Sequence, residues 1–526
     1  MHRINHMFFI KFEGRQVAGV PRGLQNRCGG LRASRVGSIP TSPVLLLIGR
    51  RNYDMENSRT ILRDIPKVDE LLFDEQLIFL MNGMPRTVVV DAVREIIGQV
   101  RTDILSGVKT SVPSKDCIIA EVCNQMKEKR RRSLGQLINA TGVVLHTNFG
   151  RANLSHTVVE HVCRIASSYS NLEYDVKRGI RGTRDAHVEK LIQTITGAEA
   201  AIVVNNNAAA TMLCLSALCY GKEVVVSRGE LVEIGGSFRI PDIMKQSGAY
   251  LREVGATNKT KLSDYEQGYD PELTGAFMKV HTSNYRIMGF TQEVKIGEMA
   301  ELGKALSVPV IYDMGSGLMV NLSHYGVDEP TVVDAINSGA DVVLFSGDKL
   351  LGGPQGGVII GKREYIEKMK QHPLARVLRV DKMTLAAMEA TLYEYLDMEG
   401  ARKKIPVLQM ITVSEEQLLQ KAKALKLCLE QDENKFTFET VKCEDQIGGG
   451  SAPMTKLPGY AVLAFREGVS AEHLERLLRN AEMPVIARVF HEKILLSVRT
   501  IGEDEFGAVA EAFSYVSVCL SGAEGA

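Results

Sequence analysis

The spacing of apolar residues divides the chain into regions of different structure. Between residues 61 and 132, apolar side chains recur every three or four positions, as at Val68, Leu71 and Leu72. This spacing places them on one face of a helix, so it predicts a small helical domain. The domain ends in the basic run 127–132, which is either a solvated helix end or a contact to phosphate.

Residues 135–400 alternate short, β-branched apolar runs with helical segments. Seven runs are expected to form strands: Ala201–Val204, Glu223–Ser227, Tyr250–Val254, Phe277–Thr282, Val308–Met314, Asp341–Ser346 and Gly357–Ile360. Because segments of crossover length separate these runs, the pattern predicts an α/β layered domain with a seven-stranded, mainly parallel sheet.

The pattern changes again after this domain. A helical connector is expected near residues 380–435, and residues 458–516 alternate strand, helix, strand, strand and helix, which predicts a small α+β domain. The expected parts of the chain are an extension at 1–54, a helical domain at 55–134, the α/β domain at 135–400, and the connector with the C-terminal α+β domain at 401–526.

Composition and charge exclude several classes of protein. Lys plus Arg (63) balances Asp plus Glu (63) in the 526 residues, so any polyanion must be bound by a local patch. The nine cysteines are scattered without metal-ligand spacing, which argues against a zinc site and a disulfide scaffold and favours a cytoplasmic location. No apolar run approaches the roughly 18 residues of a membrane span.

Residues 1–54 differ from the rest of the chain. They contain nine basic and two acidic residues, and Gly and Pro interrupt them without helical periodicity. The segment is either a basic arm for RNA or upstream sequence translated from a mis-assigned start, with Met55 as the initiator. We favour the second interpretation because nothing in the segment is patterned to fold.

The ends of the predicted strands carry the candidate chemistry, because ligands of open α/β sheets bind beyond the carboxyl ends of the strands. Asn206, Asn207 and Ala208 follow the first strand and begin a helix, where free backbone N–H groups can hold a phosphate. The glycine-rich run 352–357 does not open a helix after a first strand, so a Rossmann dehydrogenase is not indicated.

Two further strands end in residues of complementary charge. Asp313 ends one strand, and Lys349 follows Ser346 at the end of the next. Pyridoxal phosphate requires an amine for its aldehyde, an anion opposite its ring nitrogen and a phosphate site. The ordered set of phosphate site, Asp313 and Lys349 therefore predicts a pyridoxal 5'-phosphate enzyme, in which Ser346 would also contact the cofactor.

Three long motifs extend this prediction. The segments 138–151, 346–355 and 372–382 closely resemble those of the bacterial selenocysteine synthase (L-seryl-tRNA(Sec) selenium transferase) family, and the likeness covers about residues 60–515. The resemblance implies a fold-type I pyridoxal phosphate transferase. It also implies conversion of L-seryl-tRNA(Sec) to L-selenocysteinyl-tRNA(Sec) with selenophosphate, through a cofactor-bound aminoacrylyl intermediate.

The resemblance also implies roles for individual residues. Lys349 would carry the cofactor and act on the α-proton, Asp313 would keep the ring nitrogen protonated, and Asp348 would orient the lysine or assist proton transfer. Arg151, Arg376 and Arg379 would bind the selenophosphate anion, for which guanidinium groups are suited.

The same family assembles as a ring of dimers, a homodecamer, whose N-terminal domain grips the tRNA. We expect the same of this chain, at residues 55–134. The roles of His146 and of the basic loop Lys177 to Arg184 stay open, since each has a structural and a substrate-binding interpretation.

Two alternatives remain at this stage. A pyridoxal phosphate lyase of a phosphorylated amino sugar acid would share the fold, but it is expected to lack the helical region at 60–132. A tRNA-binding protein without catalysis would lack Lys349 or Asp313, and both are present.

Overall fold

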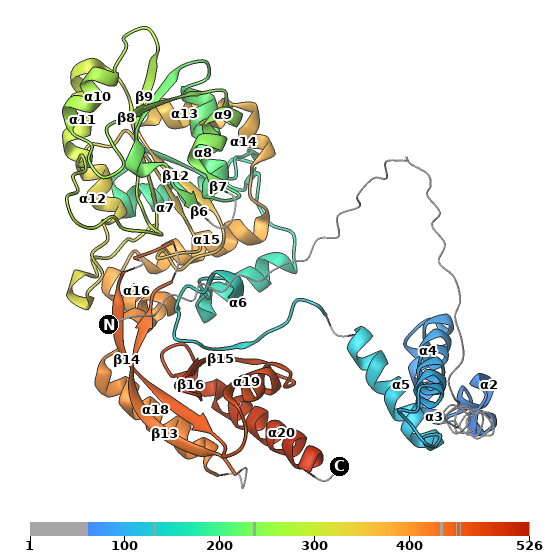
Figure 1. Cartoon of the computed structure of the whole chain (residues 1–526). Helices are drawn as coiled ribbons and strands as arrows, with labels where there is room; N and C mark the ends of the chain where they lie inside the picture. Colours follow the sequence, from blue (N-terminus) through green and yellow to red (C-terminus); the bar gives the residue numbers. More distant parts are fainter. Residues whose placement is uncertain are drawn as a thin grey trace, which may run out of the picture. The chain divides into compact units, whose positions relative to one another are not determined.

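A computed structural model describes residues 61–130, 132–234, 238–431, 435–448, 450–452 and 454–524 (Figure 1). The extension expected at 1–54, and Met55 with it, lies outside these residues. The chain divides into two compact units, with the boundary between Leu134 and Gly135. Within the described ranges, no helix combines the length and apolar character needed to span a membrane.

The first unit is helical, as the apolar spacing predicts. Its elements are η1 (Leu62–Asp64), α2 (Val68–Leu71), α3 (Glu75–Asn82), α4 (Arg86–Leu105) and α5 (Lys115–Arg130). Val89, Val93 and Ile97 on one face of α4 are buried in a core shared with Ile118 and Val122 of α5. The i, i+4 spacing of these side chains puts them on the same helix face, so packing of the two helices defines this core.

The second unit contains a seven-stranded sheet in the order β4-β12-β11-β10-β9-β5-β8. The strands are β4 (Ala200–Val204), β5 (Glu223–Ser227), β8 (Tyr250–Val254), β9 (Thr274–Val280), β10 (Val310–Gly315), β11 (Val342–Ser346) and β12 (Gly357–Gly361). Only β12 runs antiparallel to its neighbours, β11 and β4. The link from β11 is too short for a crossover, which explains that direction. The predicted fold class is thus confirmed.

Helices cover both faces of this sheet, and alternate residues of each strand face opposite layers. On one side, Val203 and Val343 pack with the layer that includes Val188 of α7 and Leu385 of α15. On the other side, the neighbouring strand residues pack against a layer that includes α8, α9 and α13. The helices of this part are α6 (His156–Ala166), α7 (Ala186–Thr196), α8 (Asn207–Leu218), α9 (Ile240–Ser247), α10 (Leu262–Gly268), α11 (Ile296–Leu306), α12 (Val332–Asn337), α13 (Arg363–Gln371), α14 (Pro373–Val377) and α15 (Lys382–Glu394).

Short elements connect these layers. They are the hairpin strands β2 (Tyr174–Asp175), β3 (Ile180–Arg181), β6 (Glu233–Ile234) and β7 (Phe238–Arg239), and the 3₁₀ turns η2 (Thr147–Phe149), η3 (Arg228–Glu230) and η4 (Ser323–Tyr325).

The C-terminal part is a five-stranded sheet, in the order β1-β15-β16-β14-β13, packed against helices. Its elements are β1 (Ile138–Ala140), α18 (Glu415–Leu429), β13 (Thr437–Gln446), β14 (Lys456–Phe465), α19 (Ala471–Arg479), β15 (Val485–Phe490), β16 (Lys493–Ser497), η5 (Glu503–Glu505) and α20 (Phe506–Glu524). The helices that lead into it, α16 (Met398–Lys404) and α17 (Pro406–Thr412), pack in the core of the large sheet.

Two strands of this sheet differ from the sequence expectation. Strand β1 lies inside the segment assigned to the α/β domain, but it pairs with β15, where Ile138 lies opposite Val485. Strand β13 has no counterpart among the predicted strands. Strand β1 has only three residues, which is too short for its pattern to specify a partner strand. In β13 most residues are at least partly exposed, so the apolar pattern that predicts a strand is weak. Pairing with distant strands therefore decides both.

Candidate active site

Lys349 lies in the loop that follows β11 and is 6% exposed. The backbone N–H of Leu350, the next residue, donates to Ser316 O at 2.9 Å, and that of Gly347 donates to Gly356 O at 2.8 Å. These bonds fix the loop on both sides of the lysine. The amine is therefore held at the carboxyl end of the sheet rather than in solvent.

Asp313 lies on the adjacent strand β10 and is 4% exposed. Asn207 Nδ2 donates to its Oδ1 at 2.8 Å, and Thr211 Oγ1 lies 3.1 Å from its Oδ2. Burial raises the pKa of Asp313, and the hydrogen bonds from Asn207 and Thr211 partly offset that effect. Both of these partners are neutral, and the positive charge of Lys349 also lowers the pKa of Asp313, although no described cation forms an ion pair in direct contact with it.

The start of α8 lies beside Asp313. Asn206 is the N-cap, and its side chain accepts from Ala209 N at 2.8 Å. Residues Asn207 and Ala208 then form the first turn, whose N–H groups have no acceptor within the helix. This helix start can bind a phosphate through its backbone N–H groups and its dipole. The start of α8, which follows β4, thus supplies an anion site next to the carboxylate.

Asp348 connects the lysine loop to Arg151. It is 8% exposed and accepts from Arg151 Nη1 at 2.8 Å. Burial, followed by the positive charge of Arg151, holds the pKa of the Lys349 amine below its ordinary value, against the opposing effect of Asp313 and Asp348. A larger fraction of neutral, nucleophilic amine at neutral pH follows from that shift.

The C-terminal part of the chain also reaches Lys349. Gly450 has φ +92°, and a Cβ built on it would lie 3.3 Å from Lys349 Nζ. Upstream, Val144 N donates to Gln446 O at 3.0 Å and Leu145 N donates to Ile447 O at 2.6 Å. The segment that follows β13 is therefore hydrogen-bonded to residues 144–145. Further along the same segment, a side chain at position 450 would crowd the Lys349 amine.

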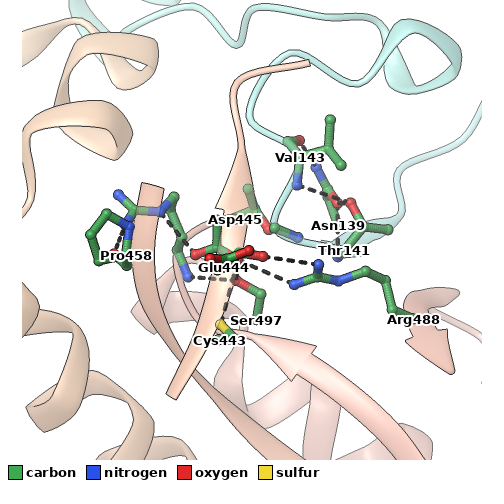
Figure 2. A network of polar contacts seen from close by, with 12 residues as sticks. Asn139, Thr141, Val143, Cys443, Glu444, Asp445, Pro458, Arg488 and Ser497 are labelled. Carbon is green, nitrogen blue, oxygen red and sulfur yellow. Dashed lines mark hydrogen bonds and ion pairs between the residues drawn. The ribbon is translucent and has the colours of Figure 1, made fainter. Parts of the chain in front are cut away.

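A buried ionic network anchors this segment, and Figure 2 shows its centre at Asp445. Asp445 is fully buried and accepts from Arg499 Nε at 2.9 Å, Ser497 Oγ at 2.8 Å and Arg488 Nη2 at 3.3 Å. Gly142 lies against it with φ +73°, and a Cβ there would come 2.1 Å from Asp445 Oδ1. The network thus ties the end of β13 to the segment that precedes Arg151.

The three predicted anion-binding arginines occupy different surroundings. Arg151 contacts Asp348, as described above, whereas Arg376 is exposed on α14. Arg379 is also exposed, and its Nη1 lies 3.5 Å from Glu173 Oε1. Its backbone lies beside the end of β4, because Val204 pairs with Arg379. The structure thus places Arg379 near the strand that leads into α8.

The basic loop at 177–184 also contacts Glu173, the carboxylate that lies beside Arg379. Arg184 Nε donates to Glu173 Oε1 at 2.7 Å and its Nη1 donates to Val380 O at 2.5 Å, while Arg181 Nη2 donates to Glu173 Oε2 at 3.2 Å. Glu173 therefore joins this loop to the segment that carries Arg379.

The two remaining candidates, His146 and Ser346, have contacts within their own turn or strand pair. His146 caps η2 by accepting from Asn148 N at 3.3 Å, and its ring stacks on Phe149 with centroids 3.7 Å apart. Burial lowers the pKa of His146. Ser346 is buried at the end of β11, opposite Gly357 of β12.

Sequence reasoning did not single out several residues at this edge. Thr211 contacts Asp313, and His281 Nε2 lies 2.7 Å from Glu329 Oε2 while its backbone N–H donates to Asp313 O at 2.8 Å. In the structure His281 follows β9, but the predicted strand runs from Phe277 to Thr282 and contains it, so the strand-end rule passes over this residue. Glu329 and Gly450 follow no predicted strand and carry no such signal.

Most of the chain is similar in sequence to known proteins of one family. A family model described as L-seryl-tRNA selenium transferase matches residues 137–502, and one described as selenocysteine synthase N terminal matches residues 62–101. The L-seryl-tRNA(Sec) selenium transferase of Clostridium botulinum (strain Okra / Type B1) is 47% identical over 460 residues, covering 87% of this chain and 99% of that protein. Its counterpart in Alkaliphilus oremlandii (strain OhILAs) is 46% identical over 465 residues, covering 88% and 99%.

A solved structure agrees with the fold. D-Glucosaminate-6-phosphate ammonia-lyase matches with a TM-score of 0.52 at 20% identity, covering 76% of this chain and 98% of that chain. This likeness bears on the fold alone, which is that of fold-type I pyridoxal phosphate enzymes. The extent and identity of the sequence matches confirm the resemblance stated above, and the chain belongs to the L-seryl-tRNA selenium transferase family.

Proposed function

We propose that this protein converts L-seryl-tRNA(Sec) to L-selenocysteinyl-tRNA(Sec), with selenophosphate as the selenium donor and pyridoxal 5'-phosphate as the cofactor. The observation that carries the proposal is a buried lysine of lowered pKa, Lys349, at a strand end beside Asp313, in a chain of this family. These are the groups that such a reaction needs from the protein.

The residues present fit the cofactor. Lys349 offers the amine, Asp313 offers an anion whose partners are neutral, and the start of α8 offers N–H groups for a phosphate. When bound, pyridoxal phosphate supplies an electron sink for the carbon that loses its proton. Asn206, Asn207, Ala208 and Ser346 complete the proposed cofactor site.

The chain's own residues divide the remaining tasks. The ionised Asp313 would hold a proton on the ring nitrogen, and burial strengthens that ion pair because little water screens it. The Lys349 amine would accept the α-proton of the seryl group, since its lowered pKa leaves it neutral more often. Asp348, held by Arg151, would orient Lys349.

Arg151, Arg376 and Arg379 are the proposed contacts to selenophosphate. Arg151 contacts Asp348, the residue before Lys349, and the segment of Arg379 lies beside the strand that leads into α8. A planar guanidinium can bind two oxygens of a phosphate-like anion at once, which supports the choice of arginine at these positions. Arg376 is exposed and free to take part from the surface of α14.

The helical unit is the proposed tRNA-binding region, and a homodecameric ring of dimers is the proposed assembly. The match of residues 62–101 to the selenocysteine synthase N-terminal family supports the first. If lysine and arginine contacts to phosphate carry the binding, tRNA affinity will fall steeply as salt rises, because counterions are released.

The alternative, a lyase of a phosphorylated amino sugar acid, is disfavoured. The ammonia-lyase structure is only 20% identical to this chain, against 47% for the selenium transferase of Clostridium botulinum. The lyase alternative also gives no role to the helical region at 62–101, which matches a selenocysteine synthase family.

The test is incubation of the purified protein with pyridoxal phosphate, seryl-tRNA(Sec) and selenophosphate, with seryl-tRNA(Ser) as the control substrate. We expect selenocysteinyl-tRNA from the first tRNA and none from the second. Absence of the selenocysteinyl product in both reactions would refute the proposed function.

A further inference from the structure

Ser283 carries a buried hydroxyl that the proposed reaction has not yet used. The residue follows β9 and is 1% exposed, and its Oγ has no hydrogen-bond partner among the described residues. An unpaired buried hydroxyl costs about 1–3 kcal/mol. Such a group is expected to have a partner when the protein functions.

The backbone holds Ser283 against the strand of Asp313. His281 N donates to Asp313 O at 2.8 Å, and Ser283 N donates to His281 O at 2.9 Å. The tight turn after β9 is therefore fixed to β10. The position of the Ser283 side chain follows from these bonds rather than from a free loop.

The hydroxyl and the lysine amine approach the same point. A Cβ built on Gly315 would lie 3.7 Å from Lys349 Nζ and 3.8 Å from Ser283 Oγ. Gly315 has φ +69° and no side chain, so nothing of its own separates the two groups. A ligand atom attached near the Lys349 amine is thus within reach of the Ser283 hydroxyl.

The order of the strands indicates which ligand atom that is. The sheet places β4, with the phosphate site at α8, on one side of β11 and β10, and places β9, with Ser283, on the other. In pyridoxal phosphate the ring carbon that bears the aldehyde lies between the ring carbon that bears the phosphate arm and the ring carbon that bears the hydroxyl. With the aldehyde at Lys349 and the phosphate at α8, the ring oxygen points toward the β9 side.

We propose that Ser283 donates a hydrogen bond to the ring hydroxyl oxygen of bound pyridoxal phosphate. This inference rests on the proposed function, because it assumes the cofactor at Lys349. Ser316 is the strongest competitor, since its hydroxyl is also buried and lacks a partner among the described residues. It lies on the β10 side with Asp313, whereas Ser283 lies on the side where the ring oxygen is expected.

The test uses the full-length protein loaded with pyridoxal phosphate and no other substrate. The pH midpoint of the cofactor's visible absorbance band and the cofactor's dissociation constant are measured for wild type and Ser283→Ala. A hydrogen-bond donor stabilises negative charge on the ring oxygen. Without the Ser283 hydroxyl, the proton shared between the Lys349 nitrogen and the ring oxygen should therefore be kept to higher pH. We expect the midpoint to rise by about one pH unit and the dissociation constant to rise about tenfold, as for a hydrogen bond to a charged oxygen.

Two variants control for folding. Ser283→Thr keeps the hydroxyl and should keep the wild-type midpoint. Ser247→Ala removes an equally buried hydroxyl, one that donates to Met244 O at 2.7 Å, and should not change either measurement. If Ser283→Ala does not fold, Ser283→Cys, a weaker donor of similar size, replaces it and should raise the midpoint.

The outcomes separate this inference from the proposed function. An unchanged midpoint in a folded Ser283→Ala or Ser283→Cys protein would overturn the inference, and so would a shift in Ser316→Ala alone. Failure of wild type to form a borohydride-reducible adduct at Lys349 would instead refute the cofactor assignment, and the inference with it.

Discussion

The large sheet and the C-terminal sheet each bury a carboxylate, and they surround it differently. Asp313 in the large sheet receives hydrogen bonds from neutral groups of Asn207 and Thr211. Asp445 in the C-terminal sheet is paired with the guanidinium groups of Arg499 and Arg488. The charge of Asp313 is therefore available to a cationic ligand, whereas the charge of Asp445 is paired with arginines and stabilises the fold.

Two buried lysines show the same difference. Lys349 is 6% exposed and has a lowered pKa, mainly because of burial. Lys279 is 7% exposed, but Glu230 and Glu293 outweigh its burial and raise its pKa. Burial alone therefore does not distinguish a reactive lysine from a structural one. A charge that the protein leaves without an opposite charge in direct contact is the more specific signal for a reactive site.

The largest effect is expected from Lys349→Ala. Because Lys349 is the proposed amine, turnover should fall below detection, and borohydride should no longer trap the cofactor on the chain. Mass spectrometry of the reduced protein measures the adduct. Lys362→Ala is the matched control, since Lys362 is half-exposed and pairs with Asp341 at the opposite end of β11. A trapped adduct on another lysine would contradict the assignment.

Asp445→Asn should have the next largest effect, and it should act on stability. The substitution leaves the buried Arg499 without its counter-ion, and breaking a buried pair costs about 3–5 kcal/mol. Urea denaturation of the cofactor-free protein measures the loss. Unchanged stability would show that Asp445 does not anchor the C-terminal sheet.

Asp313→Asn is the same chemical change in the other region, with the opposite expected result. Burial raises the pKa of Asp313, so the ionised form costs folding free energy at neutral pH, and the neutral amide should stabilise the cofactor-free protein. Turnover should fall about 100-fold, or about 2.7 kcal/mol, because an amide cannot hold the ring nitrogen protonated. Near wild-type turnover, or a loss of stability like that of Asp445→Asn, would remove the distinction between the two carboxylates.

The smallest shift is expected in cofactor uptake by Arg151→Met, measured without selenophosphate. Arg151 contributes to the lowered pKa of Lys349, second to burial, so its removal should raise that pKa. The pH at which the cofactor-free protein reaches half its maximal rate of pyridoxal phosphate uptake should then rise, by about half a unit. Arg402→Met, at an arginine paired with Glu399 on α16, is the control. A midpoint that stays or moves down would exclude an electrostatic role for Arg151.

The sequence was sufficient for the features whose signal is local. All seven strands of the large sheet overlap predicted runs. For every strand except the mostly exposed edge strand β8, the reason is that a buried strand needs a short apolar segment. Asp313, Lys349 and the start of α8 were found from their order, since parallel strands carry their carboxyl ends to one edge. The structure brings these residues together, while their roles as cofactor contacts stay predictions.

Only the tertiary structure decided the features that depend on distant residues. Strand β1 joins a sheet more than 300 residues further along the chain, Asp445 meets Arg499, and Gly450 reaches Lys349. Ser283 directly follows a predicted strand, but its hydroxyl became specific only once the structure showed it buried without a partner among the described residues. Periodicity reports how a segment meets the core, but the partner of a polar group depends on which distant segment packs beside it.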